Sequence, residues 1–306
     1  SMGCVNHLAF ASECGDIKVL NEIAKVTAST EFKSYFKNEI STGISYPTAL
    51  SNTMGNFECS LKDTISSPNN VLGIEYIKAL NEINSSIIPF TILRKGDAHN
   101  STDICSEFAS ASNIRRILVA KTDVTNYIPE NCIDILKNAV NNGQLATLDN
   151  NMRGVLLKLR NMIASDIAKI ADVNEGLEHR LHNAINTSCS VDEIIENTKT
   201  KRYTYARIRR LIISCLLDIT KEFTEQRPDY IRVLGFTKKG AEVLNTMKHT
   251  SSVPIVTKLT NLPEGISDNA KRMLELEIKS TDLYYTFTNS LNMCGMEYKN
   301  GLVIIK

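Results

Sequence analysis

The sequence predicts an α/β N-terminal part followed by a mainly α-helical C-terminal part with a few short strands. Two observations carry this prediction. Helical and strand patterns alternate twice in the first 120 residues, which favours a parallel sheet. Beyond residue 130 long helical periods dominate, and short apolar segments return only after Pro228. The turn-rich stretch NNGQLATLDNN lies near this change, so we expect two domains, residues 1–125 and 126–306.

The N-terminal part is expected to contain two strands and several helices. A buried strand is expected at 6–12, and a second strand at 86–96 with Pro89 near its beginning. Helices are expected where apolar residues recur at helical spacing, at 16–40, 48–55, 66–83 and 106–120. Asp16 is placed to cap the first of them. The helix at 66–83 begins at Ser67-Pro68, and Leu72, Tyr76, Ala79 and Leu80 are expected to lie on one of its faces.

The C-terminal part is expected to be built mainly from helices. Their predicted ranges are 151–170, 175–187, 191–197 and 204–225. After Pro228, the segments YIRVLGFTKKG, SVPIVTKL and GLVIIK are short and apolar enough to be strands or buried edges.

Whole-chain properties argue for a cytoplasmic protein. No apolar run approaches the ~18 residues of a membrane span, and the N-terminus has no signal-peptide pattern. The eight cysteines include no C-x-x-C pair, so we expect reduced thiols and no zinc ribbon. The net charge of +1 argues against indiscriminate nucleic-acid binding but permits a local basic patch. The sequence does not indicate whether the protein is a monomer or an oligomer.

Three segments of the N-terminal part are candidates for phosphate or nucleotide binding. SASNIRR supplies Ser110, Ser112 and Arg115 where a loop opens a helix, although this motif taken alone is better explained by Ser110 or Ser112 acting as a helix cap. LRKGDAH supplies Arg94, Lys95 and His99 at the carboxyl end of an expected strand, where ligands bind in open α/β sheets. The PNN sequence before a helix adds amide groups.

EGLEHRLH at 175–182 places His179 and His182 one helical turn apart. Two histidines without a third ligand are weak evidence for zinc, so we expect no metal site there. A structural or RNA-contact role is the better interpretation for His179 and Arg180.

KTKRYTYARIRR, residues 199–210, is the strongest charge signal in the chain. Its cations crowd the start of a helix expected to be capped by Thr204, where the helix dipole prefers acids by about 0.3–1 kcal/mol per charge. An anionic partner would explain this arrangement, and Tyr203 and Tyr205 could stack on unpaired bases. The alternative is a solvated helix face. The expected RNA-contact residues in this stretch are Lys199, Lys201, Arg202, Tyr203, Tyr205, Arg207, Arg209 and Arg210.

These motifs together resemble the bacterial tRNA(Met) cytidine acetate ligase family. The resemblance runs along nearly the whole chain, through FASECGDI, GISYP, SSPNNVLGIEY, PFTILR, SASNIR, EGLEHR, TKRYTYARIRR and YIRVLGFTKKG. It implies an incomplete Rossmann-like nucleotidyltransferase domain of the HUP type, followed by a mainly helical tRNA-binding domain. It also implies an ATP-dependent ligase that forms acetyl-adenylate and acetylates N4 of the wobble cytidine of elongator tRNA(Met).

The resemblance assigns residues to the nucleotide. Asn69 and Arg94, with Lys95 beside it, match ATP contacts, and Mg²⁺ is expected to accompany the ATP. Ser110, Ser112 and Arg115 match the second nucleotide signature, facing the triphosphate. Ala11 stands where the family has a glycine, and a Cβ at this point of close backbone approach would crowd the nucleotide.

The chain has no Asn/His-x-Gly-His motif, and its first residues match about a hundred residues into the family pattern. We therefore expect an N-terminally truncated polypeptide with weak or no ATP binding and no ligase activity of its own. Two alternatives stay open: a non-catalytic RNA-binding module, and a nucleotidyltransferase acting on a small phosphorylated metabolite.

Overall fold

The computed structural model describes residues 2–95, 108–174 and 176–305. Its contacts divide the chain into two compact units, one from Val5 to Lys137 and the other from Asn138 to Lys306 together with the residues up to Cys4. The division falls inside a helix and further along the chain than the boundary expected after residue 125. The functional division into a nucleotide domain and a tRNA-binding domain stays a prediction.

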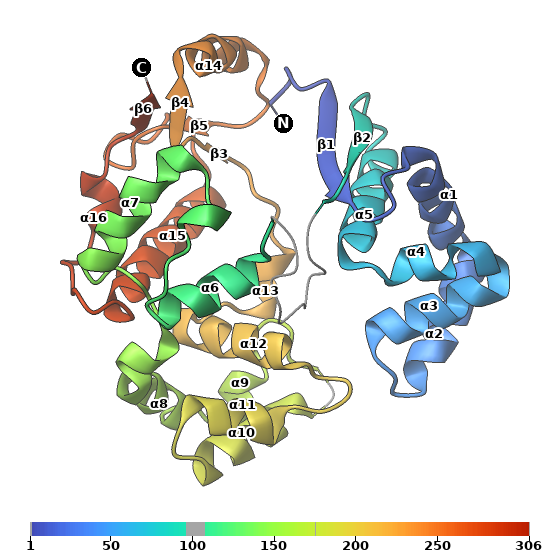
Figure 1. Ribbon diagram of the computed structural model, residues 1–306, viewed down its shortest axis with the longest axis horizontal. Helices are drawn as coiled ribbons and strands as arrows, with labels where there is room; N and C mark the ends of the chain where they lie inside the picture. Colours follow the sequence, from blue (N-terminus) through green and yellow to red (C-terminus); the bar gives the residue numbers. More distant parts are fainter. Residues whose placement is uncertain (1, 96–107, 175, 306) are drawn as a thin grey trace. The chain divides into compact units, whose positions relative to one another are not determined.

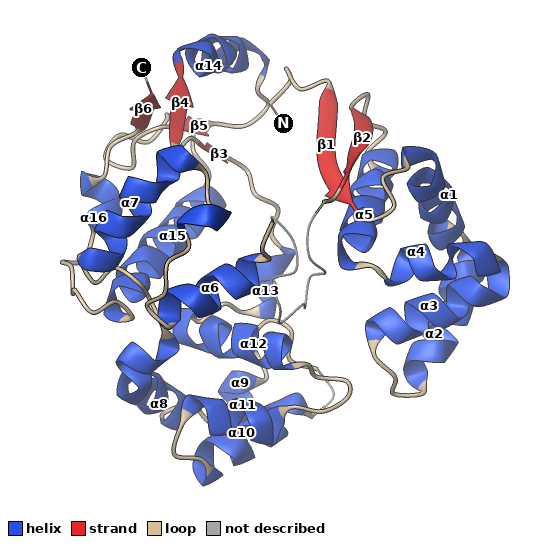
Figure 2. Ribbon diagram, viewed as in Figure 1, coloured by secondary structure: helices blue, strands red, loops and turns tan. Residues whose placement is uncertain are grey.

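Helices dominate the first unit, and two strands form its sheet (Figures 1 and 2). In chain order the elements are β1 (His7–Ser12), α1 (Ile17–Ala28), α2 (Thr30–Ser41), α3 (Tyr46–Phe57), α4 (Lys62–Ser66), α5 (Pro68–Glu82), β2 (Ile88–Leu93), α6 (Ala111–Val119) and α7 (Glu130–Asn141), whose last residues belong to the second unit.

β1 and β2 are parallel, as the alternation of helices and strands predicts, with Ala9 opposite Phe90 and Ser12 opposite Leu93. Helix α5 packs closely on this sheet because Gly73 faces the Phe10 ring. A Cβ on Gly73 would lie 2.3 Å from Phe10 Cε2, too close for any side chain larger than hydrogen.

The expectation of a buried strand at 6–12 is wrong for one face of β1. Leu8, Phe10 and Ser12 point to the more buried face, whereas Ala9 and Ala11 alternate with them and are exposed. On β2, the Phe90 and Ile92 side chains are exposed as well. Uniform apolar character therefore overstated the burial of β1.

The helix at 66–83 does not bury the face that carries Leu72, Tyr76, Ala79 and Leu80. Leu72, Tyr76 and Ala79 are exposed, and the buried side of α5 consists of Asn70, Gly73, Ile74 and Ile77. Gly73 and Asn70 carry no apolar side chain, so a hydrophobic pattern alone assigned the stripe to the wrong side.

The expected helix at 16–40 is two helices. Ser29 separates α1 from α2 with extended backbone, donates its N–H to the Val26 carbonyl and accepts from the Phe32 N–H. A serine that can satisfy backbone groups on both sides competes with helix continuation.

The second unit is mainly helical. In chain order its elements after α7 are α8 (Met152–Arg160), α9 (Ala164–Ile167), α10 (Leu177–Thr187), α11 (Val191–Thr198), α12 (Tyr205–Leu217), α13 (Lys221–Glu225), β3 (Ile231–Arg232), β4 (Gly235–Thr237), α14 (Lys238–Thr250), β5 (Ile255–Val256), α15 (Asp268–Thr286), α16 (Met296–Lys299) and β6 (Val303–Ile305). β3 pairs with β5 and β4 with β6, both in parallel.

One apolar core holds α8 to α12 together. It includes Leu159, Ile167, Leu181, Ile194 and Ile212, all of which are fully buried. The spacing of Ile208, Leu211, Ile212, Cys215 and Ile219 predicts one apolar stripe on this helix. The first four are buried on α12, whereas Ile219 lies beyond its end and is partly buried.

Three helix predictions for this unit need correction. The expected helix at 204–225 ends at Leu217, where Asp218 adopts a left-handed backbone (φ 56°). The expected helix at 151–170 breaks after Arg160. The predictions beyond Pro228 included no helix, whereas α14 and α15 are long helices. Among the described residues, none of the helices combines the length and apolar character that a membrane span requires.

Candidate functional site

The carboxyl ends of β1 and β2 bring together two predicted nucleotide-binding residues. Glu13 follows β1, Arg94 follows β2, and Asn69 lies in the first turn of α5. The edge formed by the carboxyl ends of parallel strands is where ligands bind in open α/β sheets. We call the group Glu13, Asn69, Asn70 and Arg94 the carboxyl-edge cluster.

Glu13 is the centre of this cluster. Its Oε1 accepts from Asn69 Nδ2 at 2.6 Å and from the Asn69 N–H at 3.3 Å, and it lies 3.8 Å from an Arg94 guanidinium nitrogen. Its Oε2 accepts from the Asn70 N–H at 2.9 Å. The N-cap residue Ser67 makes no side-chain capping bond, so the distant carboxylate of Glu13 caps α5 instead.

Asn70 completes the connection from the helix side. Its Oδ1 accepts from the N–H groups of Glu13 (2.8 Å) and Cys14 (3.1 Å), and its Nδ2 donates to the Thr64 carbonyl at 2.8 Å. The residue is 1% exposed. Glu13 and Asn70 thus bind each other's backbone, which fixes the β1–α1 turn against the start of α5.

The electrostatics of the cluster keep Glu13 ionised. Partial burial alone would raise the pKa of Glu13, but hydrogen bonds from the Asn69 side chain and from the backbone N–H groups outweigh burial and lower it. An ionised Glu13 orients Asn69 and partly neutralises Arg94. A triphosphate approaching this edge would therefore compete with Glu13 for the guanidinium.

The other predicted nucleotide-binding residues have different settings. Lys95 is exposed next to Arg94, and Ala11 lies on the exposed face of β1. Ser110 is buried and caps α6 by accepting from the Asn113 N–H at 3.2 Å, as the helix-cap alternative predicts. Ser112 and Arg115 are exposed on α6.

Within the described part of the chain, no hydrogen bond or ion pair joins α6 residues Ser110, Ser112 or Arg115 to the carboxyl-edge cluster. His99 lies outside the described residues. Among the described residues, the structure therefore brings together two of the three segments expected to bind nucleotide: Asn69 from PNN, and Arg94 with its neighbour Lys95 from LRKGDAH.

The basic loop, residues 199–204, connects α11 to α12 and has a defined conformation. Thr200 Oγ1 accepts from the N–H groups of Arg202 (3.2 Å) and Tyr203 (3.0 Å), and the Thr200 N–H donates to the Tyr203 carbonyl at 3.0 Å. Thr204 then caps α12 by accepting from the Arg207 N–H, as expected.

Tyr203 is a core residue, and this corrects its assignment as a base-stacking side chain. It is 8% exposed, belongs to the apolar core of α8 to α12, and donates its hydroxyl to the Asn174 carbonyl at 3.2 Å. The guanidinium carbons of Arg202 and Arg207 lie 6.0 and 5.0 Å from its ring centroid. Tyr203 therefore positions these arginines and has no free face for a base.

Tyr205 is the tyrosine that solvent reaches. It is 39% exposed, and its hydroxyl donates to Asp192 Oδ1 at 3.0 Å. Burial, the hydrogen bond to Asp192 and that carboxylate's charge raise the pKa of Tyr205, so it remains a neutral phenol.

The cations of residues 199–210 fall into two groups. Lys199 pairs with Glu196 at 2.8 Å, and Arg207 donates to the Asp172 carbonyl at 2.9 Å, so both are engaged within the protein. Lys201, Arg209 and Arg210 are exposed, and none has a hydrogen-bond or ion-pair partner among the residues that the structure describes. The acids of α11 thus offset part of the charge that the sequence shows as uninterrupted.

Arg180 has a structural role at the other end of the loop. Its guanidinium donates to the carbonyls of Asn197, Thr198 and Lys199, at 3.1, 2.7 and 3.3 Å. These bonds satisfy carbonyls at the carboxyl end of α11, where a cation is also favoured by the helix dipole. His179 Nε2 lies 3.7 Å from Glu178 Oε1, and its side chain is 78% exposed. Among the described residues, no group of three or more His, Cys, Asp or Glu side chains is arranged to hold a metal.

The sequence prediction missed Glu13 and Asn70. Both lie in quoted segments, FASECGDI and SSPNNVLGIEY, but neither was assigned a role. An acid directly after a strand and a second Asn beside Asn69 were the available signals. Only the fold shows that the two segments meet.

Comparison with known proteins decides the family. A family model described as HIGH Nucleotidyl Transferase matches residues 1–299. The tRNA(Met) cytidine acetate ligase of Acetivibrio thermocellus is 34% identical over 324 residues, covering 99% of this chain and 78% of that protein. The chain belongs to the tRNA(Met) cytidine acetate ligase family of HIGH nucleotidyl transferases. The tRNA(Met) cytidine acetate ligase of Clostridium kluyveri is similar too, at 35% identity over 100% of this chain and 77% of the relative.

Solved structures of this family agree with the fold. The apo crystal structure of Thermotoga maritima TmcAL superposes with a TM-score of 0.91 at 29% identity, covering 99% of this chain and 78% of that one. A second crystal form of TmcAL, bound with alpha-thio ATP, gives a TM-score of 0.88 at 28% identity, covering 99% of this chain and 77% of that one. The family and the nucleotidyltransferase fold expected from the motifs are therefore confirmed. The roles of individual residues in nucleotide and tRNA binding stay predictions.

Proposed function

We propose that this chain belongs to an ATP-dependent ligase that forms N4-acetylcytidine at the wobble position of elongator tRNA(Met). It provides the carboxyl-edge cluster beside the nucleotide and the surface that binds the tRNA. The observation that carries the proposal is the match to tRNA(Met) cytidine acetate ligases along 99% of the chain. The TmcAL structure with alpha-thio ATP supports ATP as the nucleotide. Cytoplasmic tRNA and free acetate are the proposed substrates.

The proposed reaction has two balanced steps. An acetate oxygen attacks the α-phosphorus of ATP, and pyrophosphate leaves to give acetyl-adenylate. The N4 amine of the cytidine then attacks the acetyl carbonyl, AMP leaves, and the amine loses a proton. Bound ATP supplies the activated phosphorus, and we expect Mg²⁺ to accompany its phosphates, as is general for such sites.

The chain's own contribution to the first step is orientation and charge. Glu13 holds the Asn69 amide and the Arg94 guanidinium in fixed positions at the sheet edge. Arg94 and Lys95 there provide positive charge for phosphate oxygens. Ser110, Ser112 and Arg115 remain proposed triphosphate contacts, although Ser110 Oγ already accepts from the Asn113 N–H.

The contribution to the second step is a grip on the tRNA. Lys201, Arg209 and Arg210 are proposed to contact phosphates, and Tyr205 offers an exposed ring for stacking. Arg202 is a further candidate contact, since it lies in the same loop. We propose that Lys199, Arg207 and Arg180 shape the loop rather than bind the tRNA, since their side chains bond within the protein. His179 stays a proposed contact at the edge of this surface.

Transfer of labelled acetate from an acetate and ATP mixture to tRNA tests the reaction. It is measured with this chain and with an upstream-extended version of it, on elongator tRNA(Met) and on the same tRNA with uridine at the wobble position. Label that requires ATP and the wobble cytidine supports the proposal. No transfer by either protein contradicts it, and label that survives the change to uridine contradicts the assigned position.

A non-catalytic RNA-binding module is the second candidate function, and it is favoured by Lys201, Arg209 and Arg210, which are exposed and have no partner within the described part of the chain. It predicts tRNA binding that does not respond to ATP and acetate.

A further inference from the structure

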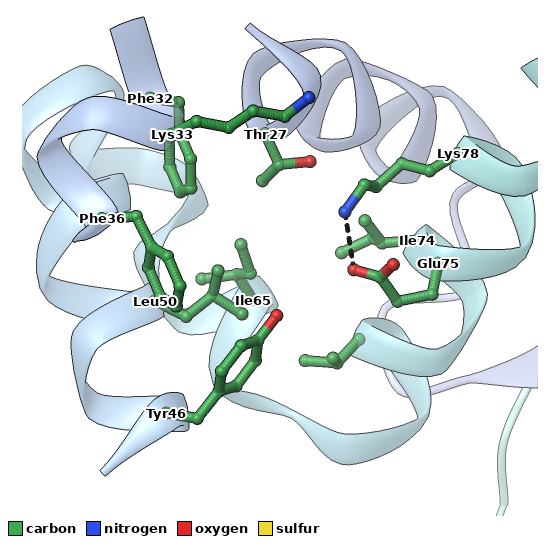
Figure 3. Close-up of a pocket in the computed structure, with 11 residues that line it drawn as sticks. Thr27, Phe32, Lys33, Phe36, Tyr46, Leu50, Ile65, Ile74, Glu75 and Lys78 are labelled. Carbon is green, nitrogen blue, oxygen red and sulfur yellow. Dashed lines mark hydrogen bonds and ion pairs between the residues drawn. The ribbon is translucent and has the colours of Figure 1, made fainter. Parts of the chain in front are cut away.

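The N-terminal unit contains a pocket of about 170 Å³ enclosed by α1 to α5 (Figure 3). Its floor is apolar and well buried: Phe32, Leu50, Ile65 and Ile74 are each at most 6% exposed. The carboxyl-edge cluster uses none of the residues that line it. A cavity of about 150 Å³ is enough to hold a benzene molecule, so the pocket is large enough for a small organic ligand.

The entrance of the pocket is polar. The hydroxyl of Tyr46 and the ammonium of Lys78 point into the space, and the Lys33 side chain runs along the side of it next to Thr27 (Figure 3). Lys78 donates to Glu75 at 2.8 Å and is 20% exposed. Two lysines against one glutamate leave this rim with a net positive charge.

Two of these donors are unused. Neither Tyr46 Oη nor Lys33 Nζ has a hydrogen-bond or ion-pair partner among the residues the structure describes. The Tyr46 ring is held by an edge-to-face contact with Phe36, at a centroid distance of 5.1 Å. In this ring orientation the hydroxyl points into the pocket (Figure 3).

We propose that this pocket binds a small monocarboxylate with an apolar body of about six carbons, the hydrocarbon against the buried floor and the carboxylate among Tyr46, Lys33 and Lys78. The apolar floor disfavours a charged or strongly polar body, because burying unpaired polar groups is costly. The volume excludes a nucleotide, since typical pockets for ligands of that size measure roughly 300 Å³ or more. The lining also includes the polar groups of Tyr46, Lys33 and Lys78, so this pocket is not bounded by apolar groups alone.

The protonation states fit this assignment. Burial and the nearby charge of Glu75 raise the pKa of Tyr46, so the phenol keeps its proton and can donate to a carboxylate. Charge-assisted hydrogen bonds of this kind are about twice as strong as neutral ones.

Methyl-labelled protein tests the proposal. Benzoate is titrated while the methyl signals of Leu50, Ile65 and Ile74 are followed by NMR, with benzyl alcohol as the neutral probe of similar shape. The expected result is a saturable shift of these three signals by benzoate, with benzyl alcohol binding at least about tenfold more weakly because it lacks the charge. No saturable shift, or equal binding of the alcohol, overturns the proposal.

Two variants and a matched control separate binding from folding. The double change Lys33→Met and Lys78→Met removes the cations and is expected to weaken benzoate binding about tenfold or more. Val71→Phe fills the space and is expected to abolish binding while the spectrum stays folded. The control, Lys18→Met with Lys37→Met, removes two exposed lysines of α1 and α2 outside the pocket and should leave binding unchanged. An equal loss in the control pair also overturns the proposal.

Discussion

The carboxyl-edge cluster and the basic loop differ in how far their charged side chains are paired within the protein. In the cluster, Glu13 caps a helix and holds Arg94, so the ionised groups satisfy one another. In the loop and the start of α12, structural bonds engage Lys199 and Arg207 but leave Lys201, Arg209 and Arg210 facing solvent. We infer that charged side chains without a partner in the protein, rather than a high density of charge in the sequence, indicate the surface suited to a macromolecular anion.

The largest expected effect comes from breaking the cluster at its buried residue. Asn70→Ala removes three hydrogen bonds and leaves two backbone N–H groups unsatisfied, so we expect the free energy of unfolding to fall by about 2–4 kcal/mol. Urea denaturation measures this change. Asn52→Ala, at an exposed position of α3, is the matched control and should cost less than about 0.5 kcal/mol. Equal costs for the two variants would refute the role of Asn70.

Removing the charge of Glu13 is expected to have a smaller effect. Glu13→Gln loses the ionised cap of α5, which should lower the free energy of unfolding by about 1–2 kcal/mol at neutral pH. Glu22→Gln on the exposed side of α1 serves as the control.

The pH dependence sharpens this prediction. Because the pKa of Glu13 is lowered in the folded protein, its contribution is fully present above the pKa of the unfolded chain and is lost as the pH falls through the folded value. The difference in stability between the wild type and Glu13→Gln should therefore shrink in acid. A constant difference between pH 7 and strongly acidic conditions would mean that the carboxylate charge is not involved.

The smallest expected effects come from substituting the two tyrosines, Tyr203 and Tyr205. Tyr203→Phe removes the bond to the Asn174 carbonyl, so we expect a loss of about 0.5–1.5 kcal/mol in stability and no change in tRNA affinity. Tyr205→Ala should instead weaken tRNA binding with little change in stability. Fluorescence anisotropy with labelled tRNA and thermal denaturation measure the two quantities. The reverse outcome would return Tyr203 to the binding surface.

The sequence predicted the parts of this molecule that depend on local pattern. The Thr204 cap, the apolar stripe of α12 and the parallel pairing of β1 with β2 were all predicted correctly. The cap and the stripe follow from side chains near each other in the chain, and the parallel pairing follows from the order of helices and strands.

Long-range contacts set the limit of the sequence prediction. Glu13 and Asn70 are 57 residues apart, and nothing in either segment states that they meet. Tyr203 looked like its exposed neighbour Tyr205 until the core of α8 to α12 was known to enclose it. Glu196 on α11 likewise pairs with Lys199, and Asp192 accepts from the Tyr205 hydroxyl, although the basic stretch itself contains no acid.

The most direct test of the account is the salt dependence of tRNA binding. The double variant Arg209→Gln and Arg210→Gln is compared with Lys221→Gln and Lys248→Gln, which remove the same charge from exposed positions on α13 and α14. We predict that the first pair weakens binding about tenfold and reduces the slope of log K against log salt by about one to two, while the control pair changes neither. Equal effects of the two pairs, or no effect of the first, would contradict it.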